Sequence, residues 1–250
     1  MIRGIYTAAA ALRAAAIHQG RLAQNLANLE TTGFKQVLTA REAYELQRLG
    51  LHRLGDSVRL GTVGGLESGL LVPPAIVDFS QGDMKVTERP LDVAIEGPGF
   101  FRVQTPEGER YTRDGSFHRD AQGRLVTGDG YFVLGDDGQP ITLPPGLLTI
   151  GRQGTLYVDG VQVGQLGLAT FPDLAALVPE SGNLFRGEGA QPMDPATIQV
   201  RQGYLEGSNV DENAQVVEMM RILRLYEASQ RSLQVQDNTL REALNVGSVT

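Results

Sequence analysis

The chain has 250 residues, 41% hydrophobic and 20% charged, which is enough apolar material for a genuine hydrophobic core. Its net charge of −7, without a Lys/Arg cluster, argues against a nucleic-acid-binding protein. The absence of cysteine excludes disulfides, thiolate zinc sites and cysteine nucleophiles.

The N-terminal end carries a heptad-like stripe of apolar or small side chains, which predicts an amphipathic helix. The stripe recurs at three- and four-residue steps through Ile5, Ala8, Leu12, Ala15, Leu22, Leu26 and Leu29, with Gln19 as its one polar break between Ala15 and Leu22. Gly33 marks the predicted stop, because glycine can adopt the left-handed conformation that ends a helix. A cleaved signal peptide is the alternative interpretation, but Arg13 interrupts the apolar run and the amphipathic pattern continues past it.

From residues 79 to 203 the hydrophobic period changes to two, which is typical of strands. Turns that contain glycine follow one another closely, at Glu107-Gly108, Ala121-Gln122-Gly123, Asp136-Asp137-Gly138 and Asp159-Gly160. We therefore expect a β-rich domain of many short antiparallel strands in this range. Residues 39–78 give weaker signals and are expected to form a connecting segment that is partly irregular.

A second apolar stripe predicts a long C-terminal helix, since residues 210–246 contain neither glycine nor proline. Ser208 or Asn209 is the expected cap. The stripe comprises Val216, Met219, Leu223, Tyr226, Leu233, Leu240 and Leu244.

A lone helix with so narrow a stripe is marginally stable in water. We therefore expect the two ends of the chain, 1–38 plus 204–250, to form one discontinuous domain of paired coiled-coil helices. Their remaining small-residue faces would be covered by copies of the same protein or by close relatives. The alternative is a helical hairpin packed on the β domain of a single monomer.

The sequence gives little support for catalysis. Its three histidines are far apart, and none stands in a spacing typical of metal or nucleophile chemistry. Glu88, Asp92, Glu96 and Asp114 could in principle supply an acid–base pair, so a peptidoglycan-acting enzyme with a β domain remains an alternative. We predict no catalytic residue, no bound metal and no cofactor.

Three separated motifs, in matching order, resemble the flagellar rod and hook protein family. The N-terminal motif contains Asn25, Leu26, Ala27 and Asn28, followed by Thr31, Thr32, Gly33, Phe34 and Lys35. The central motif contains Pro90, Leu91, Asp92, Gly97, Gly99, Phe100, Phe101, Thr112, Arg113, Asp114, Gly115 and Phe117. The C-terminal motif contains Ser208, Asn209 and Val210. Within the family, the chain is most similar to the distal and proximal rod subunits.

This resemblance implies a structural subunit of the basal-body rod, which self-assembles into a helical tube and transmits torque from motor to hook. The two helical stripes would then form the assembly seam. Export would proceed through the flagellar type III apparatus, without a cleaved signal peptide. Implied partners are copies of the chain, other rod and hook subunits, the export apparatus and ring proteins around the rod, with no nucleic acid and no membrane insertion. Another tubular or adhesive surface protein is a further alternative.

Overall fold

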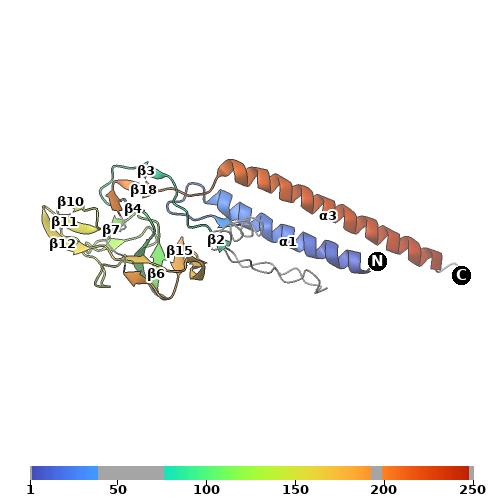
Figure 1. Ribbon diagram of the computed structural model, residues 1–250, viewed down its shortest axis with the longest axis horizontal. Helices are drawn as coiled ribbons and strands as arrows, with labels where there is room; N and C mark the ends of the chain where they lie inside the picture. Colours follow the sequence, from blue (N-terminus) through green and yellow to red (C-terminus); the bar gives the residue numbers. More distant parts are fainter. Residues whose placement is uncertain (1, 39–75, 193–198, 248–250) are drawn as a thin grey trace, which may run out of the picture. The chain divides into compact units, whose positions relative to one another are not determined.

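The computed structural model describes residues 2–38, 76–192 and 199–247. A long helix lies at each end of the chain, and short strands fill the central part (Figure 1). The predicted β-rich centre with a helix at either end is therefore confirmed. Most of the expected connecting segment, residues 39–78, falls outside the described residues. The chain divides into two compact units, of which one holds both terminal helices and the other holds Asn28–Gln36 and Val77–Val210.

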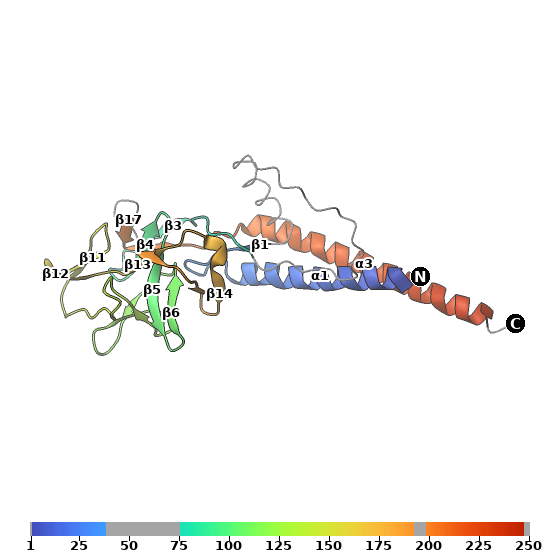
Figure 2. The ribbon, with the colours of Figure 1, turned by 60° about the horizontal axis from the view of Figure 1, so that its bottom comes forward.

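The helical unit consists mainly of α1 (Ile2–Ala27) and α3 (Glu212–Gly247), which lie side by side in both ribbon views (Figure 1, Figure 2). Ala15 and Leu22 of α1 are buried against Ile222 of α3. Met219 and Tyr226 pack against this cluster from the α3 side. Neither helix, over the residues that the structure describes, has the length and apolar character needed to cross a membrane.

Both helices have boundaries that differ from the sequence prediction. α1 ends at Ala27, six residues before Gly33, because Asn28 and Thr31 form a turn in which the Thr31 hydroxyl donates to Asn28 Oδ1 at 3.0 Å. The predicted cap of α3 is wrong, since Asp211 Oδ1 accepts the amide of Ala214 at 3.1 Å. An aspartate in this position satisfies a helix N–H group that has no partner within the helix.

The strands are short, and eighteen are present in the described part of the chain. In order they are β1 (Val37–Leu38), β2 (Ile76–Val77), β3 (Met84–Val86), β4 (Val93–Glu96), β5 (Phe100–Thr105), β6 (Gly108–Thr112), β7 (His118–Arg119), β8 (Leu125–Val126), β9 (Phe132–Val133), β10 (Leu148–Ile150), β11 (Thr155–Val158), β12 (Val161–Gln165), β13 (Leu168–Thr170), β14 (Val178–Glu180), β15 (Leu184–Arg186), β16 (Gln191–Pro192), β17 (Gln199–Gln202) and β18 (Tyr204–Glu206). A 3-10 turn, Leu174–Ala176, precedes β14.

The largest sheet has the order β14-β15-β6-β5-β9-β8-β7, and β13 joins β5 to β16. β10, β11 and β12 form a separate antiparallel sheet. The turn between β11 and β12 has positive φ at both Asp159 (50°) and Gly160 (82°), which is the pattern of a type I′ hairpin turn. The predicted turn at this dipeptide is thus confirmed.

The last strands of the β-rich unit return to its first ones. β17 pairs antiparallel with β4, and β18 pairs antiparallel with β3. Val200 of β17 is buried in the main hydrophobic cluster, beside residues such as Val93 and Ile95 of β4. The core of the unit is therefore completed by residues that come more than a hundred positions after β4 in the sequence.

β5 supplies both apolar clusters of the unit, because successive side chains of a strand point to opposite faces. Phe101 lies in the main cluster, where its ring meets Phe117 edge-on with centroids 5.0 Å apart. Phe100 lies in a second cluster rich in aromatic rings, and makes edge contacts with Phe171 and Phe185. Two fully buried phenylalanines in sequence thus serve two separate cores.

Candidate functional site

The stripe residues of the two terminal segments differ widely in burial. Leu22 is fully buried, and the half-buried members are Leu12, Leu26, Leu29, Met219, Tyr226 and Leu233. Leu29 lies two residues past the end of α1, in the β-rich unit. Val216 and Leu223 remain 38% and 40% exposed. Ile5, Leu240 and Leu244 are on the helices, but their side chains are not among those described.

The face of α3 that packs on α1 contains some residues of the predicted stripe, but Val216 and Leu223 are not among them. Met219 and Tyr226 face α1, but the positions that alternate with them on this face are Gln215 and Ile222. The sets 215/219/222/226 and 216/219/223/226 both follow steps of three and four residues, so each fits a heptad pattern. Ile222 packs against Leu22, and this leaves the neighbouring Leu223 exposed.

Three exposed apolar side chains consequently form a second stripe on α3: Val216, Met220 and Leu223. Their spacing of four and three residues places them on one face, about 100° around the helix from the buried face. We call this set the outer stripe. An exposed apolar row beside a buried one is typical of a helix that packs on more than one neighbour.

Asn25 fixes the polar end of the helix pair. It is fully buried, and its amide group donates to the carbonyl of Val37 at 2.9 Å and to Gln215 Oε1 at 3.1 Å. Its Oδ1 accepts the amide of Val37 at 2.9 Å. One motif residue therefore joins α1, β1 and α3. Because buried amides without partners are destabilising, this arrangement requires Asn at position 25 and Gln at position 215 together.

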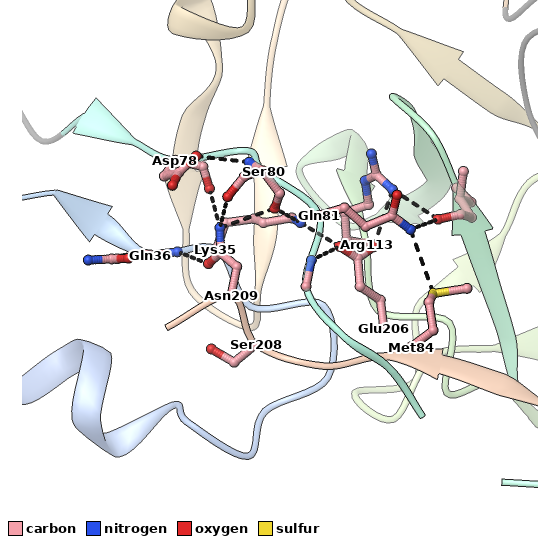
Figure 3. Close-up of polar contacts among 12 residues, drawn as sticks. Lys35, Gln36, Asp78, Ser80, Gln81, Met84, Arg113, Glu206, Ser208 and Asn209 are labelled. Carbon is pink, nitrogen blue, oxygen red and sulfur yellow. Dashed lines mark hydrogen bonds and ion pairs between the residues drawn. The ribbon is translucent and has the colours of Figure 1, made fainter. Parts of the chain in front are cut away.

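The β-rich unit contains a buried charge cluster, which we define as Lys35, Arg113 and Glu206 (Figure 3). The side chains of Lys35 and Glu206 are fully buried, and Lys35 Nζ lies 2.5 Å from Glu206 Oε1. Arg113 Nη1 lies 3.2 Å from Glu206 Oε2. Lys35 also donates to the carbonyl of Ser80 at 2.6 Å, and Arg113 donates to the carbonyl of Gly97 at 2.7 Å.

Glu206 is the only carboxylate paired with two buried cations in the described part of the chain. Burial lowers the pKa of the Lys35 amine, against the opposing effect of Glu206, and it lowers the pKa of the Arg113 guanidinium in the same way. Removing one partner of a buried pair typically costs about 3–5 kcal/mol, because the other charge stays buried without compensation. Removal of the Glu206 carboxylate would leave two buried cations, Lys35 and Arg113, without their partner.

Backbone contacts around the cluster bring the N- and C-terminal motifs together. The amide of Gly33 donates to the Glu206 carbonyl at 2.7 Å, and the amide of Gln36 donates to Asn209 Oδ1 at 2.7 Å. Asn209 Nδ2 in turn donates to the carbonyls of Asp78 at 2.9 Å and Ser80 at 3.1 Å (Figure 3). Asn209 therefore orders the polypeptide around the cluster and does not cap α3.

The central motif reaches the same region. The hydroxyl of Thr32 donates to Asp114 Oδ1 at 2.7 Å. Gly33 has φ of 65°, and a Cβ on it would lie 2.4 Å from the backbone carbon of Arg113. A Cβ on Gly115 would likewise lie 1.7 Å from the carbonyl oxygen of Val93. Both glycines are thus explained by the close approach of two backbones.

The remaining motif residues have structural positions within one unit or the other. Those that are buried are Phe34, Asp92, Gly99, Phe100, Phe101, Thr112 and Phe117. Those that are half-buried are Leu26, Asn28, Leu91, Gly97, Ser208 and Val210. Ala27 and Pro90 are exposed.

Of the four carboxylates considered for catalysis, Glu88 is exposed, and Asp114 and Glu96 have close structural partners. Asp114 accepts hydrogen bonds from Thr32 and from the Ser116 amide, and Glu96 pairs with Arg201 at 2.6 Å. Asp92 is buried, with Arg89 Nε 3.8 Å from its Oδ1. Within the described residues, no three metal-binding side chains come together.

Comparison with known proteins agrees with these motifs. Residues 94–158 match a family model described as the flagellar hook protein FlgE/F/G D1 domain, and residues 201–246 match one for the flagellar basal body rod FlgEFG protein C-terminal. Flagellar basal-body rod protein FlgG of Buchnera aphidicola subsp. Schizaphis graminum is 34% identical, over 97% of this chain and 98% of the relative. The chain belongs to the flagellar basal-body rod protein family.

Other members of the rod protein family show similar coverage. FlgG of Bacillus subtilis is 31% identical over 98% of this chain and 99% of its own length. Flagellar basal-body rod protein FlgF of Caulobacter vibrioides is 36% identical over 87% of this chain and 85% of its own. The matches name a structural rod protein and do not favour a peptidoglycan-acting enzyme. The chain is accordingly a structural rod subunit.

Sequence reasoning did not assign a role to four residues of this site. Lys35 and Glu206 stand inside or beside the motifs but were not interpreted as an ion pair, since nothing in a sequence pairs residues 171 positions apart. Gln215 and Ile222 lie one position before Val216 and Leu223. The signal available for Gln215 was its amide, which could pair with the amide of Asn25 on the other predicted helix; the sequence held no such signal for Ile222.

Proposed function

We propose that this rod subunit self-assembles into a helical tube that transmits torque from the flagellar motor to the hook. The two helices of the terminal segments, 1–38 plus 204–250, form its coiled-coil, tube-forming domain, while residues 28–36 and 204–210 of those segments pack within the β-rich unit. Residues 39–78 are proposed to connect the two, and residues 79–203 to form the outer domain. The protein resides in the basal body, reached through the type III export apparatus without signal cleavage. Its partners are copies of itself and other rod and hook subunits, with ring proteins around the rod.

The observation that carries this proposal is the outer stripe. Full burial of an apolar side chain of this size is worth on the order of 1.5–3 kcal/mol, and Val216, Met220 and Leu223 are still 38%, 55% and 40% exposed, so about half of that gain per side chain remains available to a neighbouring subunit. In the chain by itself they remain exposed on α3. A repeating contact between copies, in which this surface meets a different surface of the next subunit, would bury them and generate a helical array.

The assembly seam therefore has two parts. Leu22, Met219 and Tyr226 stabilise the helix pair within one subunit. Val216 and Leu223, together with Met220, are assigned to contacts with neighbouring subunits. The remaining seam residues, Ile5, Leu12, Leu26, Leu29, Leu233, Leu240 and Leu244, are proposed to extend these contacts along both terminal segments.

The proposal is tested by substitution of Leu223→Glu in cells that depend on this gene for their rod. A charge in the outer stripe should abolish rod assembly and motility, while helix content of the purified protein, measured by circular dichroism, stays within error of the parent. Arg224→Glu is the matched control, because Arg224 is the next residue, exposed and polar. Normal rods with Leu223→Glu would show that the outer stripe has no part in assembly.

A further inference from the structure

The β-rich unit is closed by two segments from opposite ends of the sequence. We call residues 31–36 the plug and residues 199–209 the strap. The strap contributes β17 and β18, and the amide of Gly207 donates to the Asp83 carbonyl at 2.8 Å. The plug lies against the strap through the Gly33 amide and the Glu206 carbonyl, 2.7 Å apart.

Each segment needs the other for its ion pair and its backbone hydrogen bond. Phe34 and Lys35 of the plug are buried, and the Lys35 amine depends on Glu206 of the strap for its counter-charge. Arg113, in the middle of the sequence, depends on the same carboxylate. Without the strap, Lys35 and Arg113 would lose the carboxylate with which both form ion pairs, which is strongly unfavourable at a buried site.

The strap also completes the apolar core. Val200 is buried within the main cluster, and the amide of Gly203 donates to the carbonyl of Asp92 at 2.8 Å. Absence of the strap would thus expose one edge of β4 and open a void beside Val93 and Ile95. Charge and packing both make the folding of the unit depend on a segment near its C-terminal end.

We infer that the plug, the strap and the buried Lys35–Glu206 pair form a folding latch. The β-rich unit folds only once both segments are free to meet, and it stays unfolded until then. The two charges are 171 positions apart in the sequence, so a partly delivered chain cannot close the latch. This use of the latch rests on the proposed export of the subunit. It gives an exported protein a way to remain unfolded during passage and to fold as one unit afterwards.

Pulsed hydrogen exchange during refolding of the unmodified full-length chain tests the latch without any flagellum. The amides of Gly33, Gly203 and Gly207 report the plug and strap, and those of Arg102 and Leu134 report the core. The latch predicts that all five become protected in the same kinetic phase. Protection of Arg102 and Leu134 in an earlier phase than Gly203 and Gly207 would overturn it.

Native-state exchange of two full-length variants supplies the second arm. Glu206→Gln should accelerate exchange at the core amides of Arg102 and Leu134 by about a hundredfold or more, as well as at the strap. Arg201→Gln is the matched control, because it breaks an ion pair on the same strap whose two side chains are each 45% exposed. Its effect should stay below about fivefold.

Faster exchange confined to the strap in Glu206→Gln would contradict the latch, because the core would then be stable with the strap detached. If Glu206→Gln does not fold, Lys35→Met removes the plug's charge while Glu206 keeps Arg113, and the latch predicts that strap and core amides again exchange faster together, by a smaller factor. Both outcomes are independent of rod assembly, so the latch and the proposed function can fail separately.

Discussion

The motif glycines illustrate what single residues contribute. Gly33 combines φ of 65° with a backbone neighbour at 2.4 Å from a Cβ position, so any side chain there requires Arg113 to move. We predict that Gly33→Ala lowers the free energy of unfolding by about 2–4 kcal/mol, measured by urea denaturation. Gly128→Ala is the control, because no atom lies within 4 Å of its Cβ position. Equal stability of the two variants would contradict the close packing of plug and central motif.

Tyr111 gives a pH dependence with a defined sign. Burial, together with the nearby Glu109 carboxylate, raises the pKa of its hydroxyl from 10.0 to about 12. The folded state therefore retains a proton that the unfolded state loses, and the resulting stability is present below pH 10 and is lost as the pH rises toward 12. By pH 11.5 the loss should reach about 1–2 kcal/mol, and Tyr111→Phe should remove it.

Denaturation at pH 8, 10 and 11.5 measures this effect, and tyrosinate absorbance reports the titration directly. A parent protein and a Tyr111→Phe variant that lose stability in parallel across this range would rule out Tyr111 as the cause. Seven tyrosines are present, so the difference between the two proteins is the relevant quantity.

At the scale of elements, Asn25 links α1, β1 and α3 through three hydrogen bonds. Asn25→Ala leaves Gln215 and the Val37 backbone buried without these partners, so we expect a loss of about 2–4 kcal/mol in the stability of the helix pair. Asn213→Ala, an exposed site on α3, serves as the comparison. Thermal unfolding followed by circular dichroism measures both, and a small effect at Asn25 would mean that water replaces its bonds.

The positions of the helices and of the β-rich region could be predicted from the sequence better than the side of each helix that is buried. Period-two alternation located the β-rich domain, and heptad spacing located both helices, since these patterns depend only on local side-chain direction. The burial of Ile222 in place of Leu223 could not be predicted, because both sets share Met219 and Tyr226 and only contact with α1 decides between them. The pairing of Lys35 with Glu206 was also inaccessible, since it depends on the return of β17 and β18 to β4 and β3.

For the whole molecule, the division into units predicts how truncations behave. Residues 28–36 belong to the β-rich unit although they follow α1 directly. Deletion of residues 1–27 should therefore leave a folded β-rich unit that does not assemble, while deletion of residues 1–36 should also unfold that unit by removing Lys35 and Phe34. Near-ultraviolet circular dichroism and protease resistance distinguish the two. A folded unit in both truncations would show that the plug is dispensable.

The central claim is that neighbouring subunits cover the outer stripe of α3. Because the chain contains no cysteine, Leu223→Cys introduces a single thiol whose accessibility can be followed without background from this protein. Its rate of modification by a maleimide should be high in the free subunit and at least tenfold lower in purified basal bodies. Equal rates in the free and assembled protein would contradict the claim.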